Sequence, residues 1–426
     1  MATKDVTGLT GAQMRGVHAG AIVLVGVMAL NIGNYVFHVV SARTLGPELY
    51  GDLATLIAIT GLIALPLGAV QVWVARYVAH YTAIGDEAAA RWFVRRALTY
   101  TAIGGVVMTL VLLAVAWPLR SALGIASISA VALTALTAFP AATSPITWGL
   151  AQGLQRFSLI AVTYTSGAVA RVVLTVLAFG IGLKVGGAVL ATLAAMLVAL
   201  AVPLWALRRW LQPTATSARR VTRLEAARSL SPVLLGLLAI AALTSVDVVV
   251  AKVTLTPHEA GIYGSASLVG RVILYLPAAI ITVLLPRVAA RAADQVRTTD
   301  ILRRSVVVTL AFCAIATLVY AAAGSLIVRI AFGSDYADAA GLLWLFGVAM
   351  TGYALVNVLL VYHLGHERTA FAWLLGFSAI AQIGLFLALH ESARQLVMID
   401  IAVAGGLLIS HELLTRGLLT RSLLHG

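Results

Sequence analysis

The sequence predicts an all-α polytopic membrane protein: twelve transmembrane helices in two parallel six-helix repeats around a central cleft. The 426-residue chain is 61% hydrophobic and only 11% charged, whereas a soluble domain is about 45–50% apolar and about 25% charged. Its charge-poor stretches reach the roughly 20 residues that cross a bilayer. Short motifs of the first half recur in the second, which predicts the repeats.

Twelve charge-poor stretches are the predicted spans. They cover residues 18–41, 53–75, 97–118, 128–152, 157–182, 185–207, 230–251, 261–286, 305–328, 340–363, 369–389 and 395–414. Pro140 and Pro145 in the fourth stretch predict a kink there. The longest connection, residues 208–228, carries Pro213 and six arginines. It predicts a basic cytoplasmic linker between an N-terminal bundle, residues 1–207, and a C-terminal bundle, residues 229–426.

Positive charges fall mainly on one side of this topology. With the N-terminus inside, 21 of the 29 Lys and Arg residues lie in cytoplasmic segments and 6 in opposite ones, while Arg171 and Arg271 lie within spans. The positive-inside rule therefore predicts a plasma-membrane protein with both termini cytoplasmic. Topology and anionic membrane lipids explain the net charge of +13. Because we find no basic soluble module, we expect no nucleic-acid partner.

Five landmarks recur in the same order at an offset close to half the chain. The pairs are Thr44-Leu45-x-Pro47 with Thr254-Leu255-x-Pro257, Tyr50-Gly51 with Tyr263-Gly264, Pro66 and Arg76 with Pro277 and Arg287, Arg95-Arg96 with Arg303-Arg304, and Gly153-x-x-Arg156 with Gly365-x-x-Arg368. Six spans in each half give both copies the same orientation. Such parallel repeats are typical of transporters that expose a cleft alternately to each side.

Two arginines within spans are candidate substrate-binding residues. Arg171 and Arg271 lie near mid-depth, where a charge is costly unless it faces a cavity or a partner. A guanidinium matches phosphate oxygens bidentately, so both favour an anionic substrate. The alternative is that neighbouring helices satisfy each arginine.

Two aspartates within spans are candidates for ion coupling or for ion pairing. Asp247 lies five residues before Lys252. It would carry a coupling proton or sodium ion, or else pair with Lys252 or Arg271. Asp400 has the same interpretation and no evident partner.

Asn31, Asn34 and His38 lie on one face of the first span, because their spacing is i, i+3 and i+7. This polar stripe either lines the cavity and binds substrate or hydrogen-bonds another helix. Gln71 is a similar but isolated polar residue.

The sequence gives little indication of enzyme, cofactor or metal chemistry. Cys313 is the single cysteine, which excludes an intramolecular disulfide and multi-cysteine metal sites. No nucleotide-binding or metalloprotease motif occurs, so we expect no cofactor and no resident metal. His363 and His366 lie at a span end, where we expect a solvated face.

The loop after the first span, Ala42-Arg43-Thr44-Leu45-Gly46-Pro47-Glu48-Leu49-Tyr50-Gly51, resembles that of Wzx-like oligosaccharide-lipid flippases. These belong to the multidrug/oligosaccharidyl-lipid/polysaccharide flippase superfamily. Gly153-Leu154-Gln155-Arg156-Phe157 and Leu285-Pro286-Arg287 are similar to further family landmarks. The resemblance implies a cavity formed largely by helices one, two, seven and eight, and a polyprenyl-diphosphate-linked oligosaccharide as substrate.

Related lipid II flippases use an arginine shortly before the proline of helix eight for diphosphate binding. The resemblance implies the same role for Arg271, which precedes Pro277. The second loop copy departs from the pattern, because Thr256 replaces the glycine.

The expected function is therefore a flippase that moves this substrate from the inner to the outer leaflet by alternating access, for cell-surface polysaccharide biosynthesis. Glycosyltransferases or a polymerase of the same pathway would be partners. Two alternatives stay open: a proton- or sodium-coupled small-molecule exporter using Asp247, and an inactive membrane scaffold. Outer connections of about 4 to 12 residues are too short for the acid–base loops of a polysaccharide polymerase or ligase.

Overall fold

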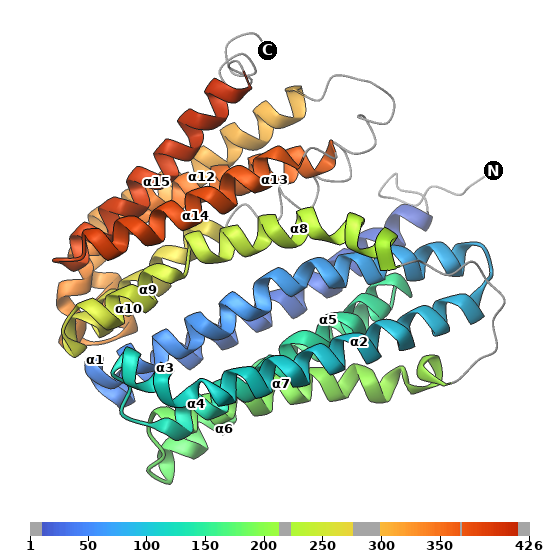
Figure 1. Cartoon of the computed structure of the whole chain (residues 1–426), viewed down its shortest axis with the longest axis horizontal. Helices are drawn as coiled ribbons and strands as arrows, with labels where there is room; N and C mark the ends of the chain where they lie inside the picture. The colour runs from blue at the N-terminus through green and yellow to red at the C-terminus, as the bar shows by residue number, and fades with distance from the viewer. Residues whose placement is uncertain (1–10, 213–222, 276–298, 367–368, 416–426) are drawn as a thin grey trace. The chain divides into compact units, whose positions relative to one another are not determined.

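The computed structural model describes residues 11–212, 223–275, 299–366 and 369–415, which contain helices and no strand (Figure 1). The α-helices are α1 (Gly11–Ala83), α2 (Glu87–Ala114), α3 (Ala116–Leu123), α4 (Ile128–Leu136), α5 (Ala138–Gly153), α6 (Phe157–Gly180), α7 (Val185–Ala206), α8 (Arg223–Leu243), α9 (Val246–Thr254), α10 (Pro257–Tyr275), α12 (Thr299–Ala331), α13 (Ala340–Gly365), α14 (Ala370–Ala388) and α15 (Ala393–Leu414). Two 3-10 helices are η1 (Arg208–Leu211) and η2 (Ser334–Ala339). The sequence landmarks Pro277, Leu285, Pro286, Arg287 and Arg368 lie outside the described residues.

The described residues contain ten helical stretches that are long and apolar enough to cross a membrane. One of them, Ile22–Ala83, is 62 residues long and contains the first two predicted spans. The described part of the eighth predicted span lies in α10, which has 19 residues. The chain is therefore an all-α, multi-pass membrane protein, and its helices agree with the twelve predicted spans.

The loop that we predicted between the first two spans is absent, and this prediction is wrong: both spans lie in the single helix α1. Within α1 the only non-helical residue is Gly46, with φ 72° and ψ 171°. Glycine adopts this left-handed φ without a Cβ penalty. Pro47 follows with a φ that suits the first turn of a helix, so the chain re-enters the helix at once.

The chain forms two compact units. Unit 1 comprises the residues up to Thr44, Leu67–Arg120 and Ala126–Ala227, and unit 2 comprises Leu45–Pro66, Ser121–Ile125 and the chain from Arg228 onward. The middle of α1 therefore belongs to unit 2 and its two ends to unit 1. The predicted bundles at 1–207 and 229–426 differ from these units mainly in the placement of Leu45–Pro66.

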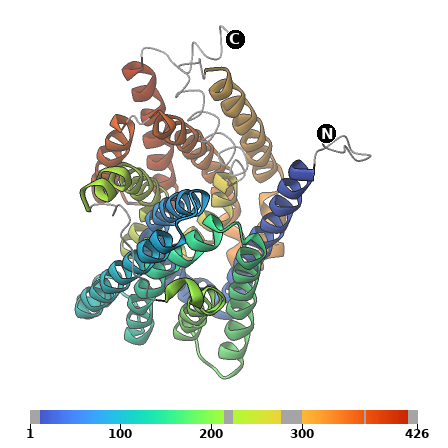
Figure 2. The same ribbon diagram turned by 90° about the vertical axis from the view of Figure 1, so that its right-hand side faces the viewer.

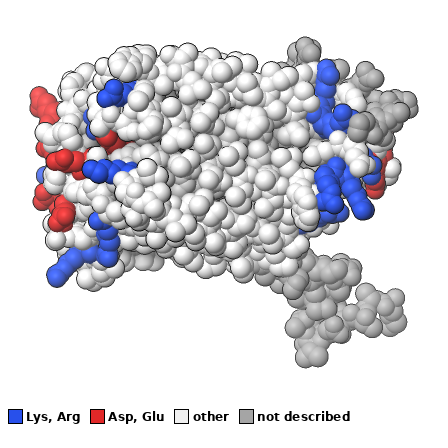
Figure 3. Space-filling model, turned by 90° about the horizontal axis from the view of Figure 1, so that it is seen from below, with Lys and Arg blue, Asp and Glu red and all other residues white. Residues whose placement is uncertain are grey.

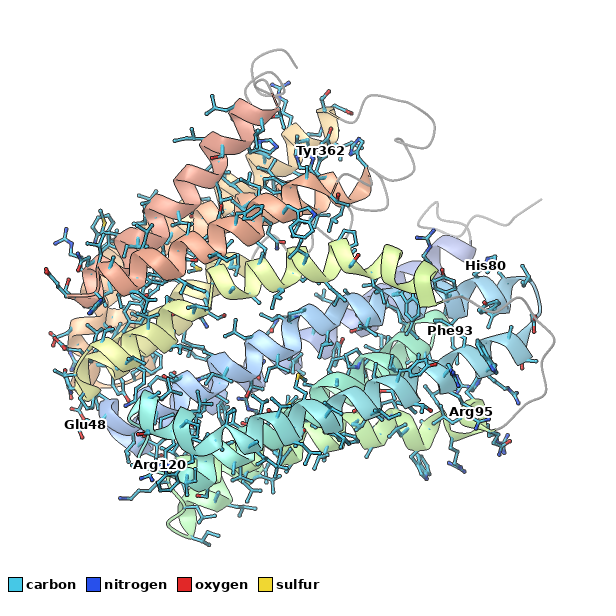
Figure 4. All side chains as sticks on the ribbon, viewed as in Figure 1. Glu48, His80, Phe93, Arg95, Arg120 and Tyr362 are labelled. Atoms are coloured by element: carbon cyan, nitrogen blue, oxygen red, sulfur yellow. The ribbon has the colours of Figure 1, made fainter. Side chains whose placement is uncertain are left out.

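The segment α4–α5 is the core of unit 1, since 78% of the most apolar window in Ile128–Gly153 is buried. α2, α6 and α7 contact α5, and Figure 2 shows these helices as a bundle. Thr137 separates α4 from α5, close to Pro140, where we predicted a kink. Figure 4 labels Phe93 of α2, whose ring centroid lies 4.9 Å from that of Trp73 in α1.

The helix α13 is the core of unit 2. It contacts α10, α12, α14 and α15, and Leu343, Phe346 and Met350 on it are fully buried. α9 contacts α10, α14 and α15. Thr244 and Ser245 separate α8 from α9, so the seventh predicted span is interrupted, and this break positions the polar cluster described below.

Apolar side chains cover the outward faces of several helices. Leu110 of α2 is 60% exposed and Leu318 of α12 is 68% exposed. On the face drawn in Figure 3, charged side chains gather at helix ends and the side chains between them are uncharged. A band of exposed apolar side chains of this kind suits lipid rather than water.

Candidate functional site

Asp247 is the centre of a buried polar cluster in unit 2. It lies in the first turn of α9 and is fully buried. Its Oδ2 accepts hydrogen bonds from Tyr263 Oη at 3.0 Å and Ser267 Oγ at 3.4 Å, and its Oδ1 lies 3.1 Å from Arg271 Nη2. Tyr263, Ser267 and Arg271 are spaced four residues apart, so they lie on one face of α10.

The sequence left Lys252 and Arg271 open as partners of Asp247, and Arg271 is the partner in the structure. Lys252 Nζ instead lies 2.6 Å from Asp52 Oδ1. Both side chains of this second ion pair are almost fully buried and lie in unit 2. Lys252 therefore joins α9 to the middle segment of α1 through this ion pair.

Asp400 has partners, contrary to the sequence prediction. It is fully buried in α15, and its Oδ1 accepts a hydrogen bond of 2.5 Å from Gln382 Nε2 of α14. The same Gln382 amide also approaches Tyr353 Oη at 3.0 Å and the carbonyl of Leu243 at 3.1 Å. Leu243 ends α8, so Gln382 ties the interrupted span to Asp400.

The two aspartates form one electrostatic cluster, because Asp400 interacts with both Asp247 and Arg271. Of the two aspartates, Asp247 forms the ion pair with Arg271. Among the described residues, Arg271 Nε and Asp400 Oδ2 are buried and make no hydrogen bond. The cluster therefore contains two acidic groups, one arginine and two polar atoms whose hydrogen-bonding capacity is unused.

Arg171 is the centre of a second polar cluster, in unit 1. Its Nη1 donates to Asn34 Oδ1 at 2.7 Å and its Nε to Thr192 Oγ1 at 3.2 Å. Its Cζ lies 3.7 Å from the ring centroid of Phe37, a distance at which cation and ring attract. The structure thus brings together two predicted site residues, Arg171 and Asn34.

The other two residues of the predicted polar stripe have different surroundings. His38 is 8% exposed, and its ring packs at 5.0 Å against that of Phe37. Asn31, one turn before Asn34, is exposed. The stripe therefore changes from exposed at Asn31 to buried at His38 along α1, with Arg171 bound at its middle.

His363 was expected on a solvated face, and this is wrong, because the ends of α13 and α15 pack together. His363 and His411 are 5% and 1% exposed, with their Nε2 atoms 3.0 Å apart. His366 is half-buried and bonds the carbonyl of Tyr362, labelled in Figure 4. Among the described residues, no group of three or more His, Cys, Asp or Glu side chains is suited to hold a metal ion.

One further polar pair, in unit 1, is not evident from the sequence. Gln71, predicted to be isolated, donates from Nε2 to Gln152 Oε1 at 3.1 Å. The only signal for this pair was the presence of one amide near the end of each of two spans.

Comparison with known proteins identifies the family and the fold. The profile of the polysaccharide biosynthesis protein family matches residues 17–292. An inward-facing multidrug resistance MATE family transporter of the MOP superfamily is 16% identical, with a TM-score of 0.73, covering 93% of this chain and 98% of that one. An outward-facing structure of such a transporter is also 16% identical, with a TM-score of 0.61 and 95% of both chains covered.

No curated protein sequence matches the chain at a significant level. The profile spans well over half of the sequence, and the solved structures share the fold over nearly all of it. Family and fold are those of membrane transporters. The chain therefore belongs to the polysaccharide biosynthesis protein family and has the fold of the multidrug/oligosaccharidyl-lipid/polysaccharide flippase superfamily.

Proposed function

We propose that this protein is a flippase that moves a polyprenyl-diphosphate-linked oligosaccharide from the inner to the outer leaflet by alternating access. Membership of the polysaccharide biosynthesis family supports a substrate of this class. The excess of arginine in alternate connections supports a plasma-membrane location with both termini cytoplasmic. Glycosyltransferases or a polymerase that makes and extends the glycan would be its partners.

The observation that carries the proposal is the Arg271–Asp247 pair inside a membrane span. The Arg271 side chain keeps 18% exposure although Asp247 is fully buried. A guanidinium in a span is costly unless it faces water or a partner. The exposed edge of Arg271 would therefore bind the diphosphate, to which arginine binds through two parallel hydrogen bonds.

The Arg271–Asp247 pair would link substrate binding to ion coupling. In its resting arrangement Arg271 is held by Asp247, and a diphosphate would compete for the same guanidinium. A proton or sodium ion taken up by the Asp247–Asp400 carboxylates would replace the charge of Arg271. Arg271 would then be available to the diphosphate, so cation uptake and substrate binding would favour each other.

The polar stripe of α1 would serve the sugar end of the substrate. Arg171 is already bound by Asn34 and Thr192, so its role would be to fix the position of Asn34 and to contribute positive charge. Asn31 is exposed and would offer its amide to sugar hydroxyls. His38 lies against Phe37 and would support the same face.

The test is transbilayer movement of a labelled polyprenyl-diphosphate oligosaccharide in proteoliposomes. Arg271→Ala at matched protein density should reduce the initial rate at least tenfold. Arg329→Ala, at an exposed position, is the control and should leave the rate unchanged. Because Arg271→Ala leaves Asp247 buried and unpaired, the double variant Arg271→Ala/Asp247→Asn should restore folding but not transport.

Transport that survives in the folded double variant would show that Arg271 does not bind the diphosphate. No movement above empty vesicles with intact protein and an imposed ion gradient would contradict the flippase function. An inactive membrane scaffold would then be the better interpretation.

A second candidate is a proton- or sodium-coupled exporter of small molecules. The two buried aspartates of the cluster, of which Asp247 pairs with Arg271, favour it, because coupling needs a site that gains and loses a cation. Asp247→Asn should then abolish drug export without affecting a lipid-linked glycan. Unchanged drug susceptibility after deletion of the protein would speak against this function.

A further inference from the structure

Unit 1 contains a close contact between α5 and the last third of α1. Gly149 and Gly153 are four residues apart on α5. A Cβ at Gly149 would lie 2.5 Å from the carbonyl oxygen of Gln71, and one at Gly153 would lie 2.8 Å from that of Ala75. These glycines therefore allow the backbones to touch, as small residues four apart do between membrane helices.

This contact brings two amides and two aromatic rings together. Gln71 Nε2 donates to Gln152 Oε1 at 3.1 Å, and the Tyr164 hydroxyl of α6 lies near Gln71. The Trp148 and Tyr164 rings meet edge to face with centroids 5.4 Å apart. Trp148 Nε1 donates to the carbonyl of Ala199 at 3.1 Å, which fixes the orientation of the indole.

The four side chains form a neutral polar group that is open on one side. Gln152 is exposed, Gln71, Trp148 and Tyr164 are half-buried, and among the described residues no charged side chain pairs with any of them. The amide nitrogen of Gln152 makes no hydrogen bond to another described residue. Gln152 lies in the last turn of α5, so this side is open to water or to a ligand.

We propose that Gln71, Gln152, Tyr164 and Trp148 form a subsite for the sugar hydroxyls of the transported lipid. The inference rests on the proposed flippase function and extends it to recognition of the glycan. Amides and a phenol can donate to and accept from hydroxyl groups, and aromatic rings cover the apolar C–H face of a sugar. The absence of charge from the group separates this subsite from the Arg271 cluster, which suits a diphosphate.

The side chains of this subsite have fixed orientations, which allows it to discriminate between glycans. The Gln71–Gln152 pair is held by backbone contact at two glycines, and Trp148 is held by a backbone carbonyl, so the donors and acceptors have fixed directions. A rigid polar site rejects a ligand that leaves its groups unpaired. These residues therefore determine which sugar is moved.

The experiment compares lipids that share one polyprenyl diphosphate and differ in the glycan. The probes are the bare lipid and the lipid carrying a tetrasaccharide of glucose, of N-acetylglucosamine or of galacturonic acid. Transport rates are measured in proteoliposomes for intact protein, Gln152→Ala, Gln71→Ala and Tyr164→Phe. Gln395→Ala is the matched control, because Gln395 is a half-buried amide whose side chain accepts one hydrogen bond, from the Glu391 N–H.

Intact protein should prefer one tetrasaccharide over the others. Each subsite variant should lower the rate for that glycan by about threefold to tenfold, the value of one to two hydrogen bonds, and leave the bare lipid unchanged. Equal losses for the bare and glycosylated lipids would show that the amides only hold helices together, which overturns the subsite. Variants that keep the full preference of intact protein would overturn it too.

Failure of the underlying function gives a different result. If intact protein moves neither the bare nor any glycosylated lipid, the flippase function is wrong and the subsite with it. If Arg271→Ala slows all four lipids while the subsite variants slow none, only the subsite is wrong.

Discussion

Lys252 Nζ lies 2.6 Å from Asp52 Oδ1, with 5% and 6% of the two side chains exposed. This pair joins α9 to the middle segment of α1 within unit 2. Two residues before Asp52, Tyr50 packs edge to face on Tyr336 with ring centroids 6.0 Å apart. The short α9, which carries Asp247 in its first turn, is thus fixed at its other end by an ion pair.

Removing one partner of this pair should be strongly destabilising. Asp52→Asn leaves the Lys252 charge buried, and breaking a buried pair costs about 3–5 kcal/mol. The double variant Asp52→Asn/Lys252→Met removes both charges and should recover much of that loss. The measurement is thermal unfolding in detergent across the full double-mutant cycle. Additive effects of the two substitutions would mean that the pair does not couple α9 to α1.

Gly261 should tolerate no side chain, because α10 and α1 meet there at backbone distance. A Cβ at Gly261 would lie 1.9 Å from the carbonyl oxygen of Pro47, whereas one at Gly61 would meet nothing within 4 Å. Gly261→Ala should therefore lower the unfolding midpoint sharply or prevent folding. Gly61→Ala, inside a helix, should be neutral or stabilising by roughly 0.5–1 kcal/mol. Equal behaviour of the two variants in the same unfolding assay would contradict this contact.

The helices and some of the side-chain pairs could be predicted from the sequence, for identifiable reasons. Long apolar stretches and their charged ends predict spans directly. The pairing of Asp247 with Arg271 was accessible because both lie on consecutive spans. The partner of Lys252 was not, because Asp52 is 200 residues away and no local spacing links the two.

Side chains near span ends were the least predictable. His363 follows an apolar stretch and precedes charged residues, a pattern that also describes a solvated helix end. Whether such a residue is buried depends on how far the neighbouring helix extends, and α15 reaches His411. The partner of Asp400 was not predictable for the same reason, because Asp400 and Gln382 lie in different spans and their contact needs the packing of α14 on α15.

The start of α10 should become less stable at low pH because of Glu259. Thr256 and Glu259 form a capping box in which the Glu259 carboxylate accepts from the Thr256 N–H at 3.1 Å and hydroxyl at 2.8 Å. These bonds hold the pKa of Glu259 below its ordinary value of 4.5. A lowered pKa contributes stability above pH 4.5 that is lost as pH falls through the folded-state value. The protection factors of the first turn of α10 against hydrogen exchange, which correct for the intrinsic pH dependence of exchange, should therefore fall in acid, and Glu259→Gln should remove that fall.

Arg171 should contribute to stability through the geometry of its guanidinium. Lysine keeps the charge but cannot reach Asn34 and Thr192 together or stack flat on Phe37. Arg171→Lys should therefore lower the free energy of unfolding by about 1.5–3 kcal/mol, the usual value for hydrogen bonds to a charged group. Arg95→Lys is the control, because Arg95, labelled in Figure 4, is exposed. Equal unfolding midpoints for the two lysine variants would show that the fork geometry of Arg171 is not used.

We expect Gln382 to stabilise the break in the seventh span through its hydrogen bonds, rather than only to fill volume. Its amide approaches Asp400 Oδ1, Tyr353 Oη and the Leu243 carbonyl, and an NH2 group with two hydrogens must share one of them between two acceptors. Gln382→Leu fills similar volume but leaves three buried acceptors poorly satisfied. An unsatisfied buried group costs about 1–3 kcal/mol. Gln382→Glu should be worse, because it places a third carboxyl group beside Asp400 and Asp247.

Asp400→Asn in the Gln382→Leu background separates the contributions. If the carboxylate of Asp400 is the main acceptor, this second substitution removes a buried charge and recovers stability. If instead the Leu243 carbonyl matters most, the double variant stays as unstable as Gln382→Leu, and amide exchange at the end of α8 is fast in both. Unfolding midpoints and amide exchange rates at Leu243 and Thr244 distinguish the two outcomes. They show whether Gln382 mainly stabilises the carboxylate of Asp400 or the helix break that positions Asp247.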